Sequence, residues 1–143
     1  MIDARVANAP RRPLRSAGAV LAGLASIVIL ATVVDTVLEK TGVFPSIADQ
    51  RRNGFDIGWM LALALTYRFA FAIVGGYVTA ALAPSRPTRH VTALMIIGFV
   101  LGSAGAVAVT DISPVWFAIA VIVTGVAGTW IGGRLRTAGR VNG

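Results

Sequence analysis

The chain has 143 residues, of which 56% are hydrophobic and only 13% are charged, about half the charged share of an ordinary soluble domain. This composition excludes a typical water-soluble globule. The absence of cysteine excludes disulfides, thiolate metal sites, iron–sulfur clusters and cysteine nucleophiles. The formal charge of +7 does not indicate nucleic-acid binding, because the arginines flank apolar segments instead of forming a patch on a folded surface. We therefore expect a membrane protein.

Four apolar runs, each about 20 residues long, are long enough to cross a bilayer. They predict helices at residues 17–38, 57–83, 89–110 and 114–133. The first run is longer than the apolar core of a signal peptide, and the preceding Arg11-Arg12-Pro13-Leu14 matches a twin-arginine export signal poorly, so we expect a retained helix. The sequence thus predicts an all-α, integral membrane four-helix antiparallel bundle, with residues 1–143 forming a single domain.

The polar connection at residues 39–56 has two interpretations. Ser46 and Asp49, followed by Asn53-Gly54, fit a short helix with an N-cap and a left-handed stop, and an unstructured link is the alternative. In the helical case, three apolar side chains would rest the segment against lipid headgroups. These side chains are Phe44, Ile47 and Phe55.

Prolines and small polar residues predict the other helix ends. Pro84 and Pro87 end the second helix, and Thr88 is the predicted N-cap of the third. Ser113 is the predicted N-cap of the fourth, with Pro114 at its first helical position. We expect the basic tail, residues 134–143, to be disordered.

The basic residues predict the orientation. Arginines are concentrated on the side of the N-terminus, at Arg5, Arg11, Arg12, Arg15, Arg86, Arg89, Arg134, Arg136 and Arg140. The opposite side holds Lys40, Arg51 and Arg52. Because cytoplasmic loops carry the excess of Lys and Arg, both termini are expected in the cytoplasm of a bacterium, with the chain in its inner membrane.

Small residues share one face of each predicted helix, where they would allow close packing in lipid. The faces are Gly18, Ala22 and Ser26 in the first helix; Ala72, Gly75 and Thr79 in the second; Gly98, Gly102 and Gly105 in the third; and Ala118, Gly125, Gly128 and Gly132 in the fourth. We interpret them as contacts within the bundle, and a homo-oligomer interface is the alternative.

Arg68 is the most informative residue, because it lies about seven to nine residues inside the second helix, or roughly 10–14 Å along its axis. An arginine at such a depth needs a partner or water. The helical repeat places it on the stripe of Leu61, Ala64, Ala72, Gly75 and Thr79, and therefore toward the bundle.

Asp35 is the candidate partner best matched to Arg68 in depth, ahead of Glu39, Asp56 and Asp111. Asp35 lies off the Gly18 stripe, so pairing requires two contact faces on the first helix. The main hypothesis is an ion pair that fixes helix rotation, and the alternatives are an ion or substrate site and snorkelling alone. Hydroxyls that would extend such a network or bond backbone carbonyls belong to Thr66, Tyr67 and Tyr77.

His90, the only histidine, is interpreted as part of a basic rim that meets anionic lipid headgroups, and a proton shuttle is the alternative. The predicted headgroup contacts are Arg86, Arg89, His90, Arg134 and Arg136. The spacing of histidines and acids predicts no metal site, and no cofactor or catalytic motif is recognised, so we do not expect an enzyme.

The stretch Gly75-Gly76-Tyr77-Val78-Thr79-Ala80-Ala81-Leu82-Ala83-Pro84-Ser85-Arg86-Pro87-Thr88-Arg89-His90 resembles small uncharacterised bacterial membrane proteins with four predicted spans. It covers about a fifth of the chain and transfers no activity. Small multidrug exporters are excluded because their mid-membrane glutamate in the first helix is missing. Fluoride channels are excluded because neither their phenylalanine-box helix nor their asparagine-bearing glycine motif is present.

Two functions remain at this stage. The first is a non-enzymatic accessory or scaffolding subunit, which docks through its glycine faces into a larger membrane complex and binds anionic lipid at its basic rim. The second is a small oligomeric transporter or channel in which a path, favouring an anion, passes Arg68.

Overall fold

The computed structural model describes residues 11–140, and over this range the chain is helical without any strand. The helices are α2 (Arg11–Lys40), α3 (Ile47–Asn53), α4 (Gly58–Leu82), α5 (Pro87–Ala108) and α6 (Val115–Gly139). All except α3 are long and apolar enough to cross a membrane. Even α5, with 22 residues, extends roughly 33 Å, against a hydrocarbon core of about 30 Å. The predicted all-α fold with four spans is confirmed, and the chain is a multi-pass membrane protein.

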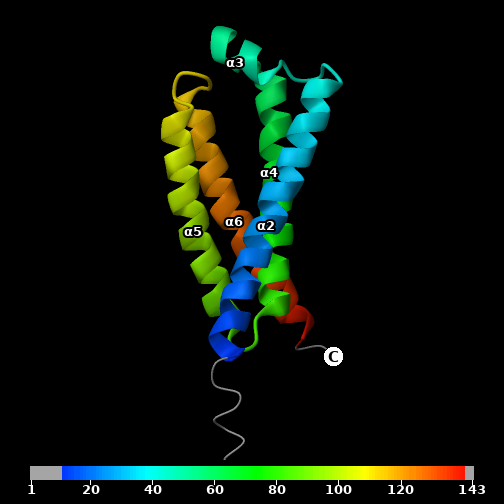
Figure 1. The fold of residues 1–143 in the computed structure, drawn as a ribbon, viewed down its shortest axis with the longest axis vertical. Helices are drawn as coiled ribbons and strands as arrows, with labels where there is room; N and C mark the ends of the chain where they lie inside the picture. Colours follow the sequence, from blue (N-terminus) through cyan, green and yellow to red (C-terminus); the bar gives the residue numbers. More distant parts are fainter. Residues whose placement is uncertain (1–10, 141–143) are drawn as a thin grey trace, which may run out of the picture.

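The four long helices form two antiparallel pairs, α2 beside α4 and α5 beside α6 (Figure 1). The pairs are joined by the most extensive contact of the fold, between α4 and α6, and they diverge toward the end that carries α3. The start of α2 and the end of α6 lie together at the opposite end. We call these two ends of the molecule the α3 end and the terminal end.

Glycines bring α4 and α6 into backbone contact. A Cβ atom added at Gly76 would overlap the carbonyl group of Thr129. At Gly128 it would lie 2.9 Å from the carbonyl oxygen of Phe69, and at Gly132 it would lie 2.8 Å from the Tyr77 nitrogen. Each distance is shorter than any real Cβ contact, so this packing exists only because these positions lack side chains.

The α2–α4 contact is also made by a pair of glycines. A Cβ at Gly23 would lie 2.7 Å from the Gly75 oxygen, and one at Gly75 would lie 2.9 Å from the Gly23 oxygen. The predicted α2 face was wrong, because Gly18 has nothing within 4 Å of its Cβ position. The hydroxyl of Ser26 bonds only the Ala22 carbonyl of its own helix, at 2.8 Å.

The structure also corrects the glycine face predicted for α5. Nothing lies within 4 Å of a Cβ added at Gly98 or Gly105, nor at Gly125 of α6, while Gly102 meets only the side chain of Ile122 at 3.3 Å. The buried side chains of α5 belong to its first part, at Val91 and Leu94. Val91 packs against Gly133 and Leu94 packs against Gly23, and neither glycine was among those predicted.

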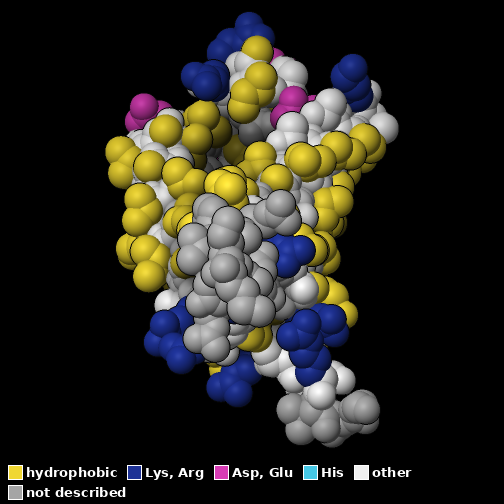
Figure 2. Space-filling view, turned by 60° about the horizontal axis from the view of Figure 1, so that its bottom comes forward, with side chains coloured by type: hydrophobic (Ala, Val, Ile, Leu, Met, Phe, Trp, Pro, Cys, Tyr) yellow, Lys and Arg dark blue, Asp and Glu magenta, His cyan; other side chains and the backbone are white. Residues whose placement is uncertain are grey.

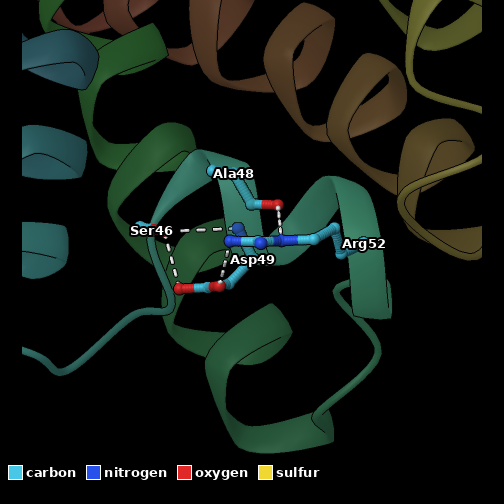
Figure 3. A network of polar contacts seen from close by, with 4 residues as sticks. All are labelled: Ser46, Ala48, Asp49 and Arg52. Carbon is cyan, nitrogen blue, oxygen red and sulfur yellow. Dashed lines mark hydrogen bonds and ion pairs between the residues drawn. The ribbon is translucent and has the colours of Figure 1, made fainter.

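The connection after α2 contains the predicted short helix α3, so the unstructured alternative is wrong. The Oγ of Ser46 accepts a bond from the Asp49 amide at 3.2 Å, and Arg52 pairs with Asp49 at 3.1 Å (Figure 3). Gly54 ends the helix with a φ of 80°. The bond to Ser46 satisfies one backbone amide at the start of α3, and Arg52 and Asp49 compensate each other's charge.

Two of the three apolar side chains around α3 face the protein instead of lipid headgroups. Phe44 and Phe55 are buried against Leu61 and Ala64, with ring centroids 5.2 Å apart. The Phe55 amide donates to the Ile112 carbonyl at 2.6 Å, which ties this segment to the α5–α6 connection. Ile47 remains exposed.

Two predicted caps are wrong. Thr88 lies inside α5, because Pro87 already occupies its first turn and Arg86, at a φ of 45°, precedes it. Pro114 is the N-cap of α6 instead of its first helical residue, so Ser113 does not cap the helix.

The basic segment after the fourth span is helical as far as Gly139, so the expected disorder is wrong for residues 134–139. Packing at Gly132 and Gly133 anchors this part of α6, and Arg134 stacks over Trp130 at 5.0 Å. Residues 141–143, and Arg5 from the predicted basic side, lie outside the described residues.

A direct test of the packing compares Gly132→Val with Gly98→Val. Valine at position 132 would collide with the α4 backbone, so we expect about 1–3 kcal/mol of lost stability, whereas the same change at position 98 enters open space and should be nearly neutral. Both losses of stability are measured by unfolding the purified protein, held in a mild detergent, with increasing amounts of a denaturing detergent. Equal losses at the two positions would contradict this packing.

Candidate functional site

The stripe of α4 that carries Arg68 faces the bundle. Four of the stripe positions, Leu61, Ala64, Ala72 and Gly75, are buried, and so is Thr79 at its inner end. The stripe predicted from the helical repeat is therefore confirmed. Arg68 interrupts this small and apolar surface with a charge.

Arg68 and Asp35 form an ion pair between α4 and α2. The guanidinium Nη2 lies 2.6 Å from Oδ2 of Asp35, and the hydroxyl of Tyr67 donates to the other carboxylate oxygen. The guanidinium also lies 5.7 Å from the centroid of the Tyr67 ring. We call Arg68, Asp35 and Tyr67 the charge cluster. Both carboxylate oxygens of Asp35 are thus used, as an intramembrane acid requires.

The position of the pair follows from the register of the two helices. From Gly23, which meets Gly75, Asp35 lies twelve residues along α2, or roughly 18 Å toward the α3 end. Arg68 lies seven residues from Gly75 along antiparallel α4, or roughly 11 Å in the same direction. Side chains lean toward the N-terminus of their helix, so Arg68 reaches toward the α3 end and Asp35 reaches back to meet it.

Pairing uses a second part of the α2 surface. Asp35 lies about 120° around the helix from Gly23, at 100° per residue. α2 therefore meets α4 through Gly23 near the terminal end and through Asp35 near the α3 end. Two contact faces are present, as the pairing requires, although the glycine face is not the one predicted.

The other candidate members lie apart from the charge cluster. Thr66 bonds the Ala62 carbonyl of its own helix at 2.7 Å. Tyr77 lies near the terminal end, 5.9 Å from the guanidinium of Arg136. Asp56 and Asp111 are exposed, and neither forms an ion pair within residues 11–140.

Two cavities meet at Arg68. The cavity toward the α3 end has a volume of about 210 Å³ and includes all three residues of the charge cluster together with Glu39 in its lining. The cavity deeper in the membrane has a volume of about 280 Å³ and is lined by all four long helices, mainly with apolar side chains. Arg68 lines both, so its charge lies between a cavity that contains the other polar side chains of the charge cluster and a cavity lined mainly by apolar ones.

The sequence did not reveal that α3 and its flanking loops line the cavity toward the α3 end, which we call the outer cavity. Its lining includes Phe44, Phe55 and the buried Gln50, whose amide donates to the Pro45 carbonyl at 2.8 Å. The indication available in the sequence was the presence of two phenylalanines, Phe44 and Phe55, in a short polar connection. Among residues 11–140, no group of three or more histidine or acidic side chains is placed to hold a metal ion.

Charge is distributed unevenly between the two ends of the molecule. Figure 2 shows basic side chains around the terminal end below an apolar band, and both acidic and basic side chains toward the α3 end. The only ion pairs among the described residues are Arg52–Asp49 and Arg68–Asp35. Among residues 12–140, none of the terminal-end arginines is therefore paired. These arginines are Arg12, Arg15, Arg86, Arg89, Arg134, Arg136 and Arg140.

Comparison with protein-family models, curated proteins and solved structures gave no match. The resemblance of residues 75–90 to small four-span bacterial membrane proteins therefore stays a prediction.

The charge cluster can be tested by a double-mutant cycle. Arg68→Gln leaves Asp35 without its cation in a membrane helix, and Asp35→Asn leaves Arg68 without its anion, so each should lose about 1–3 kcal/mol of stability. The double variant should recover part of this loss, because no single charge remains. Unfolding in detergent measures the stability of the wild type, of each single variant and of the double variant. Strictly additive losses would show that the two side chains do not interact.

Proposed function

We propose that this protein is a non-enzymatic, multi-pass protein of the bacterial inner membrane with both termini in the cytoplasm. It acts as an accessory or scaffolding subunit that docks transmembrane helices of a larger complex and holds anionic headgroups at its terminal end. The observation that carries this proposal is the uneven distribution of charge between the two ends.

The uneven distribution of charge supports the orientation. Seven arginines whose side chains the structure describes lie at the terminal end, whereas every acid of residues 11–140 lies in the half of the bundle toward the α3 end. These acids are Asp35, Glu39, Asp49, Asp56 and Asp111. An arginine-rich, acid-poor end matches the cytoplasmic face of a membrane protein, where anionic lipids compensate the positive charge.

The exposed face of α5 supports a docking role. Gly98 and Gly105 leave open space beside the backbone, and the intervening Leu101 is exposed. Gly98 and Leu101 also line the deeper cavity, so a helix docked on this face would cover that cavity. In lipid, small residues allow a second helix to approach closely, and the approach itself provides the binding energy. A helix of another subunit fits this face, and a second copy of the chain is the other occupant to be tested.

The charge cluster supports a structural role for Arg68. Its charge is compensated by Asp35, and the Tyr67 hydroxyl donates a hydrogen bond to the second oxygen of that carboxylate. An ion pair shared by α2 and α4 holds the two helices in one rotational setting, which a scaffold requires.

An anion transporter or channel is the second candidate. The observation in its favour is that Arg68 lines both the outer cavity and the deeper apolar cavity, so an anion entering from the α3 end would meet a guanidinium with further N–H donors. In this case Asp35 would have to release Arg68 during passage.

The orientation is tested with reporter fusions. Alkaline phosphatase inserted at Gly42, in the connection toward the α3 end, should be active, and the same enzyme fused after Gly143 should be inactive. Green fluorescent protein should show the reverse pattern, because it matures in the cytoplasm. An active phosphatase at the C-terminus would overturn the proposed topology.

The docking role is tested by filling the glycine face. Gly98→Leu with Gly105→Leu should reduce, by about ten-fold or more, the amount of any subunit that co-purifies in stoichiometric yield in mild detergent. Gly18→Leu is the matched control, because that glycine is equally open but lies on α2.

Transport is tested separately in liposomes. If the wild type conducts chloride and Arg68→Gln abolishes the flux while the helices still associate, the scaffolding proposal is overturned in favour of the transporter. An absence of flux together with loss of helix association in Arg68→Gln supports the structural role.

A further inference from the structure

A groove runs between α2 and α5 near the terminal end. Its volume is about 500 Å³, and its lining is almost entirely apolar. Val20 and Leu21 of α2 form one wall, and Ala93 and Ile97 of α5 form the other. Arg89 and His90 lie at its terminal end, and Ile97 lies eight residues deeper along α5, or roughly 12 Å. The groove therefore has a basic mouth and an apolar body.

The mouth is positive for two independent reasons. Arg89 and His90 belong to the first turn of α5, and Arg12 and Arg15 to the first two turns of α2, so four basic residues lie near one end of the groove. Neither helix has an acid in its first turn, so the partial positive charge of each helix start is not compensated there. His90 has Nδ1 3.3 Å from the Arg86 carbonyl oxygen, a contact that can orient its ring.

We propose that this groove binds one anionic glycerophospholipid, with its phosphate at Arg89 and His90 and one acyl chain along Val20, Leu21, Ala93 and Ile97. The inference deepens the proposed function, because it rests on the terminal end facing anionic headgroups and adds a defined site with a defined ligand class.

Charge complementarity identifies the occupant. A zwitterionic lipid carries a cation beside its phosphate, which the basic mouth would repel, and the acids of residues 11–140 that could attract this cation all lie toward the α3 end. An anionic headgroup has no such requirement, and each juxtamembrane cation contributes about 1 kcal/mol to its binding. The apolar body excludes a free phosphate as the preferred ligand, because it would leave this surface without an acyl chain.

The α5–α6 side of the terminal end differs from the α2–α5 side. The space that Arg134 lines there has a volume of only about 30 Å³, and the Arg134 guanidinium is stacked over the Trp130 ring. A larger apolar groove between α5 and α6, of about 540 Å³, lies farther along α5 at Met95 and Phe99, and its lining includes no basic residue. This side therefore has basic residues and an apolar groove that are not joined in one site, and it provides the comparison variants.

The experiment titrates the purified full-length protein in mild detergent with dioleoyl-phosphatidylglycerol or dioleoyl-phosphatidylcholine, and reads bound lipid by native mass spectrometry. We expect the wild type to bind phosphatidylglycerol more tightly than phosphatidylcholine. Arg89→Gln with His90→Gln should weaken it by about ten-fold. The comparison pair, Arg134→Gln with Arg140→Gln, removes charge from the rim outside the groove and should weaken binding less than the Arg89 pair does.

A second pair of variants tests the groove without changing charge. Ala93→Trp should fill the groove and weaken phosphatidylglycerol binding by about ten-fold or more, whereas Val107→Trp, at an exposed position farther along α5, should leave it unchanged. Equal thermal unfolding of all variants establishes that the bundle is intact. If a variant unfolds, the other pair decides.

Each outcome either supports or overturns the site. If the Arg134 control weakens binding as much as the Arg89 variant, or if Ala93→Trp has no effect, the groove site is overturned, while a diffuse basic rim and the proposed function remain. If the wild type binds both lipids equally, the groove site and the proposed role of the terminal end in holding anionic headgroups are overturned together.

Discussion

Close backbone approach at the glycines of α4 is the constraint on which the rest of the structure depends. In lipid, apolar side chains gain little by meeting one another, so helices associate where their backbones can come into contact. Gly76 admits the backbone of Thr129 in α6, and Gly75 admits that of Gly23 in α2. Because α4 uses both of these faces, it lies at the centre of the bundle, and α5 is packed mainly through the part that contains Val91 and Leu94.

The charge cluster follows from this arrangement. The contact of Gly23 with Gly75 fixes the register of α2 against α4, and the opposite directions in which the two side chains lean close the remaining distance between Arg68 and Asp35. A shift of one helical turn would separate the charges by roughly 5 Å more. The ion pair therefore reports the helix register that the glycines establish, and in turn it disfavours other registers.

The sequence predicted the spans and the buried stripe of Arg68, and it offered α3 as one of two interpretations, because each depends on periodicity or local capping within one segment. It failed for Gly98 and Gly105 and missed Gly23 and Gly133, because spacing shows which glycines share a helix face but not which face meets a neighbour. The burial of Phe44 and Phe55 was missed for the same reason: it depends on contact with Leu61 and Ala64, and on an amide bond to the distant α5–α6 connection.

The two kinds of arginine in this fold differ in where their compensation comes from. Arg68 lies where lipid cannot solvate a charge, and Asp35 compensates it within the chain. At the terminal end no described acid performs this role, so the compensation of Arg89 and its neighbours must come from outside residues 11–140. Because the α2–α5 groove begins at Arg89 and continues as an apolar surface, a molecule that provides both a negative group and a hydrocarbon chain satisfies the whole site, whereas water or a soluble ion satisfies only its mouth.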